Sequence, residues 1–187
     1  MRKAAVRIAG LVATASATLM LVGAGIASAS PNPGPRHVTG PEIITGSAYG
    51  RAALANNPRI PLKLSGLVRA TDNNFRLGGN GNTHTLSTSA GWLTVTTVGR
   101  QTTRQTLNPR SCYMTDTIRQ SLVFVPRKST GKFTGASGPG SYQVSFAAYV
   151  PRYTSGKHRG ACDTNAQPLA RGAVVNFHAA GVLTVVR

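Results

Sequence analysis

Acidic residues are scarce in this chain. Four of its 187 residues are Asp or Glu, against 21 Lys and Arg, which gives a formal net charge of +17. So few carboxylates give no reason to expect a glycoside hydrolase, whose two acids must lie about 5–10 Å apart. A strongly positive surface instead attracts polyanions, and salt weakens that attraction. The four acids are Glu42, Asp72, Asp116 and Asp163.

Aromatic residues are also few. The chain has one Trp, Trp92, with five Tyr and five Phe. A polysaccharide hydrolase usually exposes more aromatic rings than this, and nucleic-acid binders interleave aromatic with basic residues for stacking. Only the stretch from Tyr149 to Arg159, which includes Arg152 and Tyr153, approaches that second pattern.

Only two cysteines are present, Cys112 and Cys162. No Cys-x-x-Cys pair or Cys/His cluster occurs, so the sequence gives no support for a metal site or a catalytic thiol. In an exported chain an even number of cysteines predicts a disulfide, and here a single pairing exists. A loop of about 50 residues closed in this way stabilises the fold by ~4 kcal/mol in the chain-entropy model.

No long apolar run occurs beyond residue 29. Before it, Met1, Arg2, Lys3 and Arg7 make a basic opening, residues 8–26 are uncharged, and Ala27-Ser28-Ala29 has the small-x-small pattern of a cleavage site. Residues 1–29 are therefore expected to be a secretory signal peptide, and residues 30–187 a secreted, extracellular protein. The alternative is a membrane anchor, but the Ala-, Gly-, Ser- and Thr-rich composition favours cleavage.

Helical signals are almost absent, apart from a turn or two at residues 50–55. Residues 30–41 contain three prolines close together and are expected to form a disordered leader. Residues 42–187 are expected to fold as a single all-β domain, because short period-two segments alternate with turn signals. An antiparallel β-barrel is the preferred architecture, with a β-sandwich as the alternative.

Five segments carry the strand pattern, at residues 59–69, 91–98, 115–125, 141–150 and 173–186. The first four alternate apolar with polar side chains, and the last is nearly all apolar and β-branched. Gly181 falls in the middle of the last segment, where it suggests a bulge or a sharp bend. The expected inner faces are Ile60, Leu62, Leu64 and Val68; Ile118, Leu122 and Phe124; Tyr142, Val144, Phe146, Ala148 and Val150; and Val175, Phe177, Leu183 and Val185.

Two short segments echo each other. Residues 125–136 and 150–161 both begin Val-Pro-Arg and end Gly-Lys-x-x-Gly-Ala. If the chain runs up to Val125, back along residues 132–136 and up again to Val150, both Pro-Arg loops emerge at the same end of the sheet. That end would then carry a cationic rim. The alternative is that two turns share one geometry and their basic residues only keep the sheet end solvated. The expected binding residues are Arg127, Lys128, Lys132, Arg152, Lys157 and Arg159, with His158 beside them.

Catalytic patterns come close and fail. Gly131-Lys132 lacks the rest of a phosphate-binding loop, and Ser129-x-x-Lys132 lacks the partner motifs of penicillin-recognising enzymes. No nucleotide and no cofactor is therefore expected. The candidates that remain are His84 and His178, either of which could join a Ser–His–Asp arrangement assembled in space with one of the four acids.

Three stretches carry a resemblance: Ile60-Pro-Leu-Lys-Leu-Ser-Gly66, residues 131–140 with Tyr142, and the final Ala180-Gly-Val-Leu-Thr-Val185. With the Ala-rich leader they resemble small exported actinobacterial proteins of unknown function. The Phe-x-Gly-Ala-x-Gly-x-Gly-x-Tyr stretch is also similar to hairpins of barrels related to allene oxide cyclase. That kinship would imply a closed antiparallel ladder able to enclose an apolar cavity. It does not imply the cyclase activity, since fold does not fix function.

Three functional hypotheses follow. The first is a non-catalytic envelope or extracellular protein that binds an anionic cell-wall polymer or acidic glycan through the basic rim. The second is a hydrolase or isomerase working in the barrel mouth, with His84 or His178 beside an acid. The third is an inhibitor or toxin that binds another secreted protein, and no residue pattern separates it from the first two.

Overall fold

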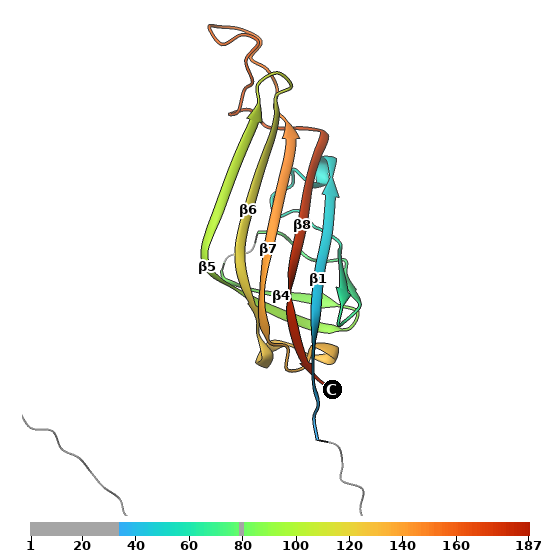
Figure 1. The fold of residues 1–187 in the computed structure, drawn as a ribbon. Helices are drawn as coiled ribbons and strands as arrows, with labels where there is room; N and C mark the ends of the chain where they lie inside the picture. The colour runs from blue at the N-terminus through green and yellow to red at the C-terminus, as the bar shows by residue number, and fades with distance from the viewer. Residues whose placement is uncertain (1–33, 79–80) are drawn as a thin grey trace, which may run out of the picture. The chain divides into compact units, whose positions relative to one another are not determined.

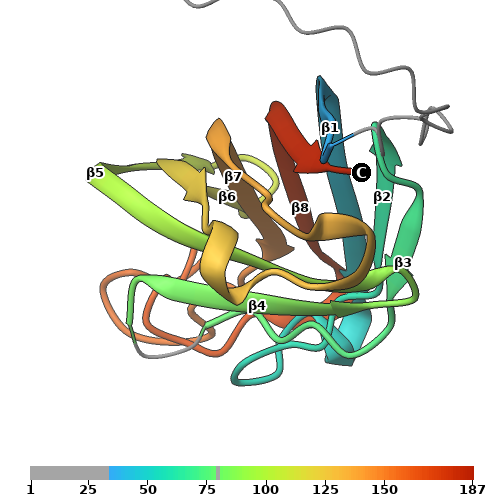
Figure 2. The same cartoon turned by 90° about the horizontal axis from the view of Figure 1, so that it is seen from below.

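The fold is a single antiparallel sheet that curls into a nearly closed barrel (Figures 1 and 2). The computed structural model describes residues 34–78 and 81–187. In these residues eight strands follow the order β3-β2-β1-β8-β7-β6-β5-β4. The strands are β1 (His37–Tyr49), β2 (Leu62–Gly66), β3 (Ala70–Asp72), β4 (Thr83–Thr88), β5 (Gly91–Asn108), β6 (Tyr113–Phe124), β7 (Gly138–Tyr149) and β8 (Leu169–Val186).

Helical structure in the described residues is limited to short 3-10 turns. They are η1 (Gly50–Ala52), η2 (Pro126–Lys128) and η3 (Gly131–Phe133). No helix in this part of the chain has the length and apolarity to cross a bilayer. The predicted all-β barrel is therefore confirmed, and the strands form one continuous sheet instead of the two sheets of a sandwich.

The first strand begins earlier than the sequence suggested. The predicted signal peptide and the first part of the leader, up to residue 33, lie outside the described residues. Residues 37–41, expected as leader, instead pair in register with residues 182–186 of β8. Val38 lies opposite Val185, which is fully buried. Pairing with the apolar C-terminal strand satisfies the backbone groups of residues that composition alone marked as disordered.

Apolar side chains alternate into the barrel as the period-two pattern predicted. Val144 and Ala148 on β7 are buried, and Val175, Leu183 and Val185 on β8 are buried beside them. Tyr142, Phe146 and Phe177 are half-buried and pack against the same core. The core lies between the long strands β6, β7, β8 and β1 on one side and β2 with the β4–β5 hairpin on the other (Figure 2).

The barrel closes at the junction of the two outermost strands, β3 and β4. The Asp72 carboxylate, which is buried, accepts hydrogen bonds from the backbone N–H of Ser87 at 3.0 Å and of Asn74 at 2.7 Å. The carbonyl of Thr71 accepts a further bond from the N–H of Ser89 at 2.9 Å. The N–H of Thr71 in turn donates to the Ser89 hydroxyl oxygen at 3.2 Å, so side-chain acceptors and one backbone bond replace a regular ladder at this junction.

Strand β5 is long and bends. Its residues 91–96 pair with β4, the register shifts between Val98 and Thr102, and residues 102–108 continue alongside β6. The bend at this irregularity is visible in Figure 1. Every residue from Val98 to Asn108 is exposed. The far half of β5 is therefore a solvent-facing edge of the sheet.

Gly181 allows a close approach between strands. The prediction of a bulge or bend there is wrong, because Gly181 pairs in regular register with both Glu42 and Gly140. A Cβ atom at Gly181 would lie 2.6 Å from the carbonyl oxygen of Pro139 and 2.9 Å from the Cα of Gly140. No side chain fits in that space. Glycine is therefore needed because the β7 backbone approaches closely, and not because β8 changes direction here.

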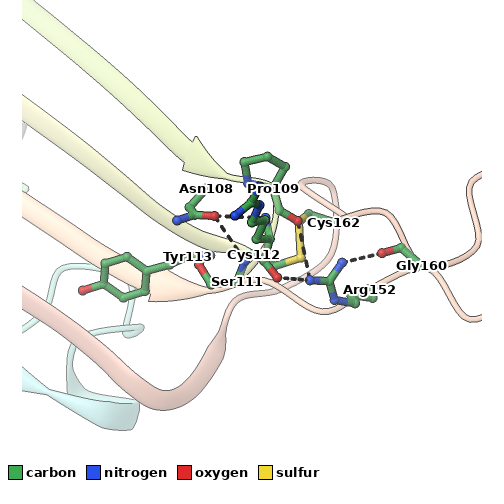
Figure 3. The surroundings of a disulfide bond; sticks show 9 residues. Asn108, Pro109, Ser111, Cys112, Tyr113, Arg152, Gly160 and Cys162 are labelled. Atoms are coloured by element: carbon green, nitrogen blue, oxygen red, sulfur yellow. Dashed lines mark hydrogen bonds between the residues drawn. A yellow bond between two sulfur atoms is a disulfide. The ribbon is translucent and has the colours of Figure 1, made fainter.

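One disulfide ties two loops at the end of the barrel away from the C-terminus (Figures 1 and 3). Cys112 and Cys162 are bonded, with their Cα atoms 5.3 Å apart. Cys112 lies in the β5–β6 connection, and Cys162 lies in the long β7–β8 connection. Within that connection Cys162 forms an isolated antiparallel β-bridge with Arg152. The pairing predicted from the cysteine count is therefore confirmed.

Candidate functional site

The expected cationic rim does not form. Strands β6 and β7 are antiparallel, with Phe124 opposite Gly138 and Tyr113 opposite Tyr149. The loop after β6 and the loop after β7 therefore emerge at opposite ends of the barrel (Figure 1). The expectation was wrong because residues 131–133 form the 3-10 turn η3, and the chain does not cross the sheet again before β7. Arg127, Lys128 and Lys132 lie at one end, and Arg152, Lys157 and Arg159 lie at the other.

Arg152 has a structural role. Its guanidinium donates hydrogen bonds to the backbone carbonyls of Gly160 and Arg110, and a longer one of 3.5 Å to that of Pro109 (Figure 3). These bonds hold the two disulfide-linked loops together. Lys157 and Arg159 stay exposed in the same loop. Arg152, one of the six predicted binding residues, therefore uses its hydrogen-bond donors within the protein itself.

A different set of basic residues gathers on the outer wall of the barrel. Strand pairing sets Thr102, Arg119, Gln143 and His178 side by side in one row across β5, β6, β7 and β8. These strands run next to one another in Figure 1. The next row contains Arg104, Thr117, Ser145 and Asn176. Adjacent strands lie about 4.8 Å apart, so each row presents polar groups at that spacing.

The outer wall is shallowly hollowed. One open depression of about 400 Å³ lies between Arg100, Arg119 and His178. The other residues around it are Thr102, Gln120, Ser121, Ser141, Tyr142 and Gln143. A second lies between Arg104 and Arg119 and is otherwise lined by threonines. We call the eight residues of the two rows, together with Arg100, Ser121 and Ser141, the outer-wall cluster. Its groups are guanidinium, imidazole, hydroxyl and amide, all of which can donate hydrogen bonds.

No acid neutralises this cluster. Glu42 and Asp72 are buried inside the barrel. Asp116 pairs with Gln105 and Phe146 and lies on the inward side of β6, where its Oδ1 atom is buried. Asp163 accepts hydrogen bonds from the backbone N–H groups of Asn165 and Ala166 in the β7–β8 loop. All four carboxylates of the chain therefore lie away from the outer wall.

The sequence interpretation missed the outer-wall cluster, although a signal for it was present. Arg100, Thr102, Arg104 and Thr106 alternate with period two, and so do Thr115, Thr117 and Arg119. Such alternation places all of these side chains on one face of neighbouring strands. The apolar positions identify the inner faces of the strands. The polar positions opposite them have the same alternation on any solvated sheet face, so the alternation alone does not identify a binding surface.

The two candidate histidines lie on opposite sides of the sheet. His84 on β4 lines a cavity of about 290 Å³ inside the barrel, and His178 belongs to the outer wall. No Asp or Glu lines either hollow. In the described residues no three His, Cys, Asp or Glu side chains are placed to hold a metal ion. The imidazole–carboxylate pair that a hydrolase or isomerase in the barrel mouth requires is therefore missing from both sites.

One polar pair lies in the cavity wall. The Tyr142 hydroxyl donates a hydrogen bond of 3.0 Å to Gln120 Oε1, and Gln120 Nε2 donates one of 3.1 Å to the carbonyl of Gly99. Partial burial raises the pKa of Tyr142 above its ordinary value. The phenol therefore stays protonated and neutral at physiological pH.

Comparisons with known proteins give no homologue. No protein-family model matches the chain, and no curated protein or solved structure shows significant similarity to it. The resemblance to small exported actinobacterial proteins and to barrels related to allene oxide cyclase stays a prediction. The geometry of the outer wall and of the cavity is what remains to indicate a function.

Proposed function

We propose that this protein is a secreted, non-catalytic binder of an anionic, hydroxyl-rich polymer, and that the outer-wall cluster is its binding surface. The polymer class is a cell-wall polyphosphate of the teichoic type or an acidic glycan. The observation that carries the proposal is the row of Arg119, Gln143 and His178, flanked by Arg100 and Arg104, on a wall without any acid.

Charge gives the attraction. The chain has 21 Lys and Arg against four acids. Three of those acids have backbone N–H groups as hydrogen-bond partners, and the fourth lies on the inner side of the sheet. The Lys and Arg side chains on the surface are therefore not neutralised by nearby carboxylates. Their electrostatic field extends into the solvent over about 8–10 Å at physiological salt. A field of one sign steers a polyanion to the surface but does not choose a position on it.

Hydrogen-bond donors give the position. Arg119 Nε donates to Gln143 Oε1 at 2.8 Å, and Gln143 Nε2 donates to Ser145 Oγ at 3.0 Å. This chain of bonds fixes the guanidinium against the sheet. Threonine and serine hydroxyls beside it can bond either phosphate oxygens or sugar hydroxyls. A polymer that repeats an anionic group along a hydroxyl-bearing backbone matches both kinds of contact.

Two double variants of equal charge test the proposal. Arg104→Gln with Arg119→Gln removes two cations from the outer wall, and Arg127→Gln with Lys128→Gln removes two from the barrel end. Retention of the full-length secreted protein is measured on immobilised poly(glycerol phosphate) and on polygalacturonate in ~0.1 M salt. The outer-wall pair should weaken retention about tenfold on at least one polymer, because two exposed ion pairs are lost. The barrel-end pair should change it less than about twofold.

The two polymers separate the two ligand sources. Stronger loss on poly(glycerol phosphate) assigns the site to a polyphosphate, and stronger loss on polygalacturonate assigns it to an acidic glycan. Equal loss in both double variants would mean that net charge alone binds the polymer, and the proposed surface would be rejected. Unchanged retention in the outer-wall variant would reject it too.

A further inference from the structure

The barrel encloses a cavity that the proposed polymer site does not use. It has a volume of about 290 Å³ and is bounded by β1, β4, β5, β6, β7 and β8 and by residues 75, 77, 78, 81 and 82. Most of its lining is aliphatic or aromatic. The cavity lies on the inner side of the sheet and the outer-wall cluster on the other side, and the only described residues that line both the cavity and the outer-wall depression are Gln120 and Tyr142.

Aromatic rings form one wall of the cavity. Phe177 lies between Phe75, at a ring-centroid distance of 5.3 Å, and Tyr142, at 6.2 Å. The rings of Tyr142 and Phe177 are nearly parallel, with an angle of 13° between their planes. All three residues line the cavity. A wall of this kind favours a flat, unsaturated ligand, because ring faces and edges attract one another beyond simple area burial.

The lining is neutral. Among the described residues that bound the cavity there is no Asp, Glu, Lys or Arg. Its polar side chains are the imidazole of His84, the phenol of Tyr142, the hydroxyl of Thr97 and the amides of Asn82, Gln101 and Gln120. A charged ligand would lose its hydration there without gaining an opposite charge, which is costly. A neutral ligand with one hydrogen-bonding group would not pay this cost of losing the hydration of a charge.

The volume limits the size of the ligand. About 290 Å³ is roughly twice the ~150 Å³ of an engineered cavity that holds benzene. It also lies near the lower end of the ~300–1,000 Å³ that is usual for ligand pockets. A molecule of two fused rings has a size that fits such a space, whereas a long acyl chain has no ring to pack against the aromatic wall.

We infer that the barrel interior is a binding site for a neutral, largely apolar molecule of about two rings with one hydroxyl or carbonyl group. The rings lie against Phe75, Phe177 and Tyr142, and the polar group bonds to the Tyr142 hydroxyl or to His84. The Tyr142 oxygen is able to accept such a bond, since its own proton is already donated to Gln120.

Four small molecules serve as probes, with binding followed by fluorescence or calorimetry on the full-length secreted protein. The site should bind 1-naphthol saturably with one molecule per chain. Naphthalene lacks the hydroxyl group, and 1-naphthoate carries a charge, so both should bind at least about fivefold more weakly. Dodecanoate should bind more weakly still. Equal or tighter binding of 1-naphthoate or dodecanoate would overturn the assignment to a neutral ring compound.

A matched pair of variants locates the binding. Ala179 lines the cavity, whereas Ala180 follows it on β8 and points to the other side of the sheet. Ala179→Phe fills the cavity and should weaken 1-naphthol binding at least about tenfold. Ala180→Phe adds the same atoms outside and should leave binding within about twofold. Equal binding by the two variants would overturn the assignment of the site.

A second pair tests the polar end of the site. Tyr142→Phe should remove most of the preference for 1-naphthol over naphthalene, and Tyr149→Phe, at an exposed position on β7, should keep it. Should Ala179→Phe fail to fold, NMR of the unaltered protein gives the answer. The ring signals of Phe75 and Phe177 should shift saturably with 1-naphthol. Unshifted ring signals, or no saturable binding, would overturn the inference.

Discussion

Arg119 Nε donates a hydrogen bond of 2.8 Å to Gln143 Oε1 across the β6–β7 pair, on the outer wall of the barrel. Among the described residues, the two terminal nitrogens of this guanidinium have no hydrogen-bond partner. The side chain is therefore both oriented by the protein and free at its outer end. Guanidinium groups held in this way are suited to bidentate contacts with phosphate or carboxylate groups.

Removing the amide of Gln143 should weaken polymer binding without changing the charge of the protein. In Gln143→Ala the guanidinium of Arg119 loses its anchor, and retention on the preferred polymer should fall about two- to threefold. Gln105→Ala is the control, because Gln105 bonds to Met114 on the inner side of the sheet. If both variants behave alike, the orientation of Arg119 does not contribute to binding.

The buried carboxyl of Glu42 should make stability depend on pH. Glu42 is 1% exposed, Val68 N–H donates to its Oε2 at 2.9 Å, and its Oε1 is buried without a partner. Burial raises the pKa of Glu42 from 4.5 to about 7, against the opposing effect of the bond from Val68. Between these two values the unfolded chain releases the proton while the folded chain keeps it.

Stability should therefore be greatest near pH 4.5, fall as the pH rises to about 7, and level off above that. The loss over this window is on the order of 3 kcal/mol at most. Urea unfolding across the window measures it. Glu42→Gln keeps an acceptor for Val68 N–H and should flatten the curve, whereas Asp163→Asn should leave it unchanged. A wild-type curve that rises from pH 4.5 to 7 would contradict this prediction.

Breaking the disulfide should cost stability and leave polymer binding intact. The bond closes a loop with a sequence separation of 50 residues, and its loss should lower the free energy of unfolding by ~4 kcal/mol. The double variant Cys112→Ala with Cys162→Ala, compared with wild type by urea unfolding, gives this value. The outer-wall cluster lies on strands and not on the bridged loops, so retention of the folded variant should equal that of wild type. A folded variant with lost retention would place those loops in the binding site.

The carboxylate of Asp72 should be important for closing the barrel. Asp72→Ala leaves the N–H groups of Ser87 and Asn74 without their acceptor, which should lower the free energy of unfolding by about 1–3 kcal/mol. Faster hydrogen exchange in β3 and β4 than in β7 and β8 would show that the loss is local. Asp163→Ala also removes an acceptor of two backbone N–H groups, but in the β7–β8 loop water can replace it, so this variant should cost less than Asp72→Ala. Equal costs in the two variants would contradict this role of Asp72.

The inner faces of the strands could be predicted from the sequence because burial imposes period two on apolar residues. Leu62, Leu64, Leu122 and Phe124 were assigned to the core in this way, and all four are buried. The disulfide could be predicted as well, since two cysteines in a chain that is expected to be exported permit one pairing. The local alternation of apolar residues is enough to predict the inner faces, and the number of cysteines is enough to predict the disulfide.

The ends of the barrel and the binding surface could not be predicted in the same way. Residues 132–136 were expected to return along the sheet, but Gly131–Phe133 forms a 3-10 turn, and that single difference places the two loops at opposite ends. The row of Arg119 and His178 depends on the register of three strands. Long-range register is not written in local composition, and exposed polar residues leave no periodic apolar signal to reveal it.

The most direct test of polymer binding on the outer wall is an NMR titration of the purified protein with short poly(glycerol phosphate) and polygalacturonate oligomers at physiological salt. Binding on the outer wall predicts saturable shifts at Arg104, Arg119, Gln143 and His178, with residues 126–132 and 152–159 unmoved. Shifts confined to those two loops, or spread evenly over every basic residue, would contradict it.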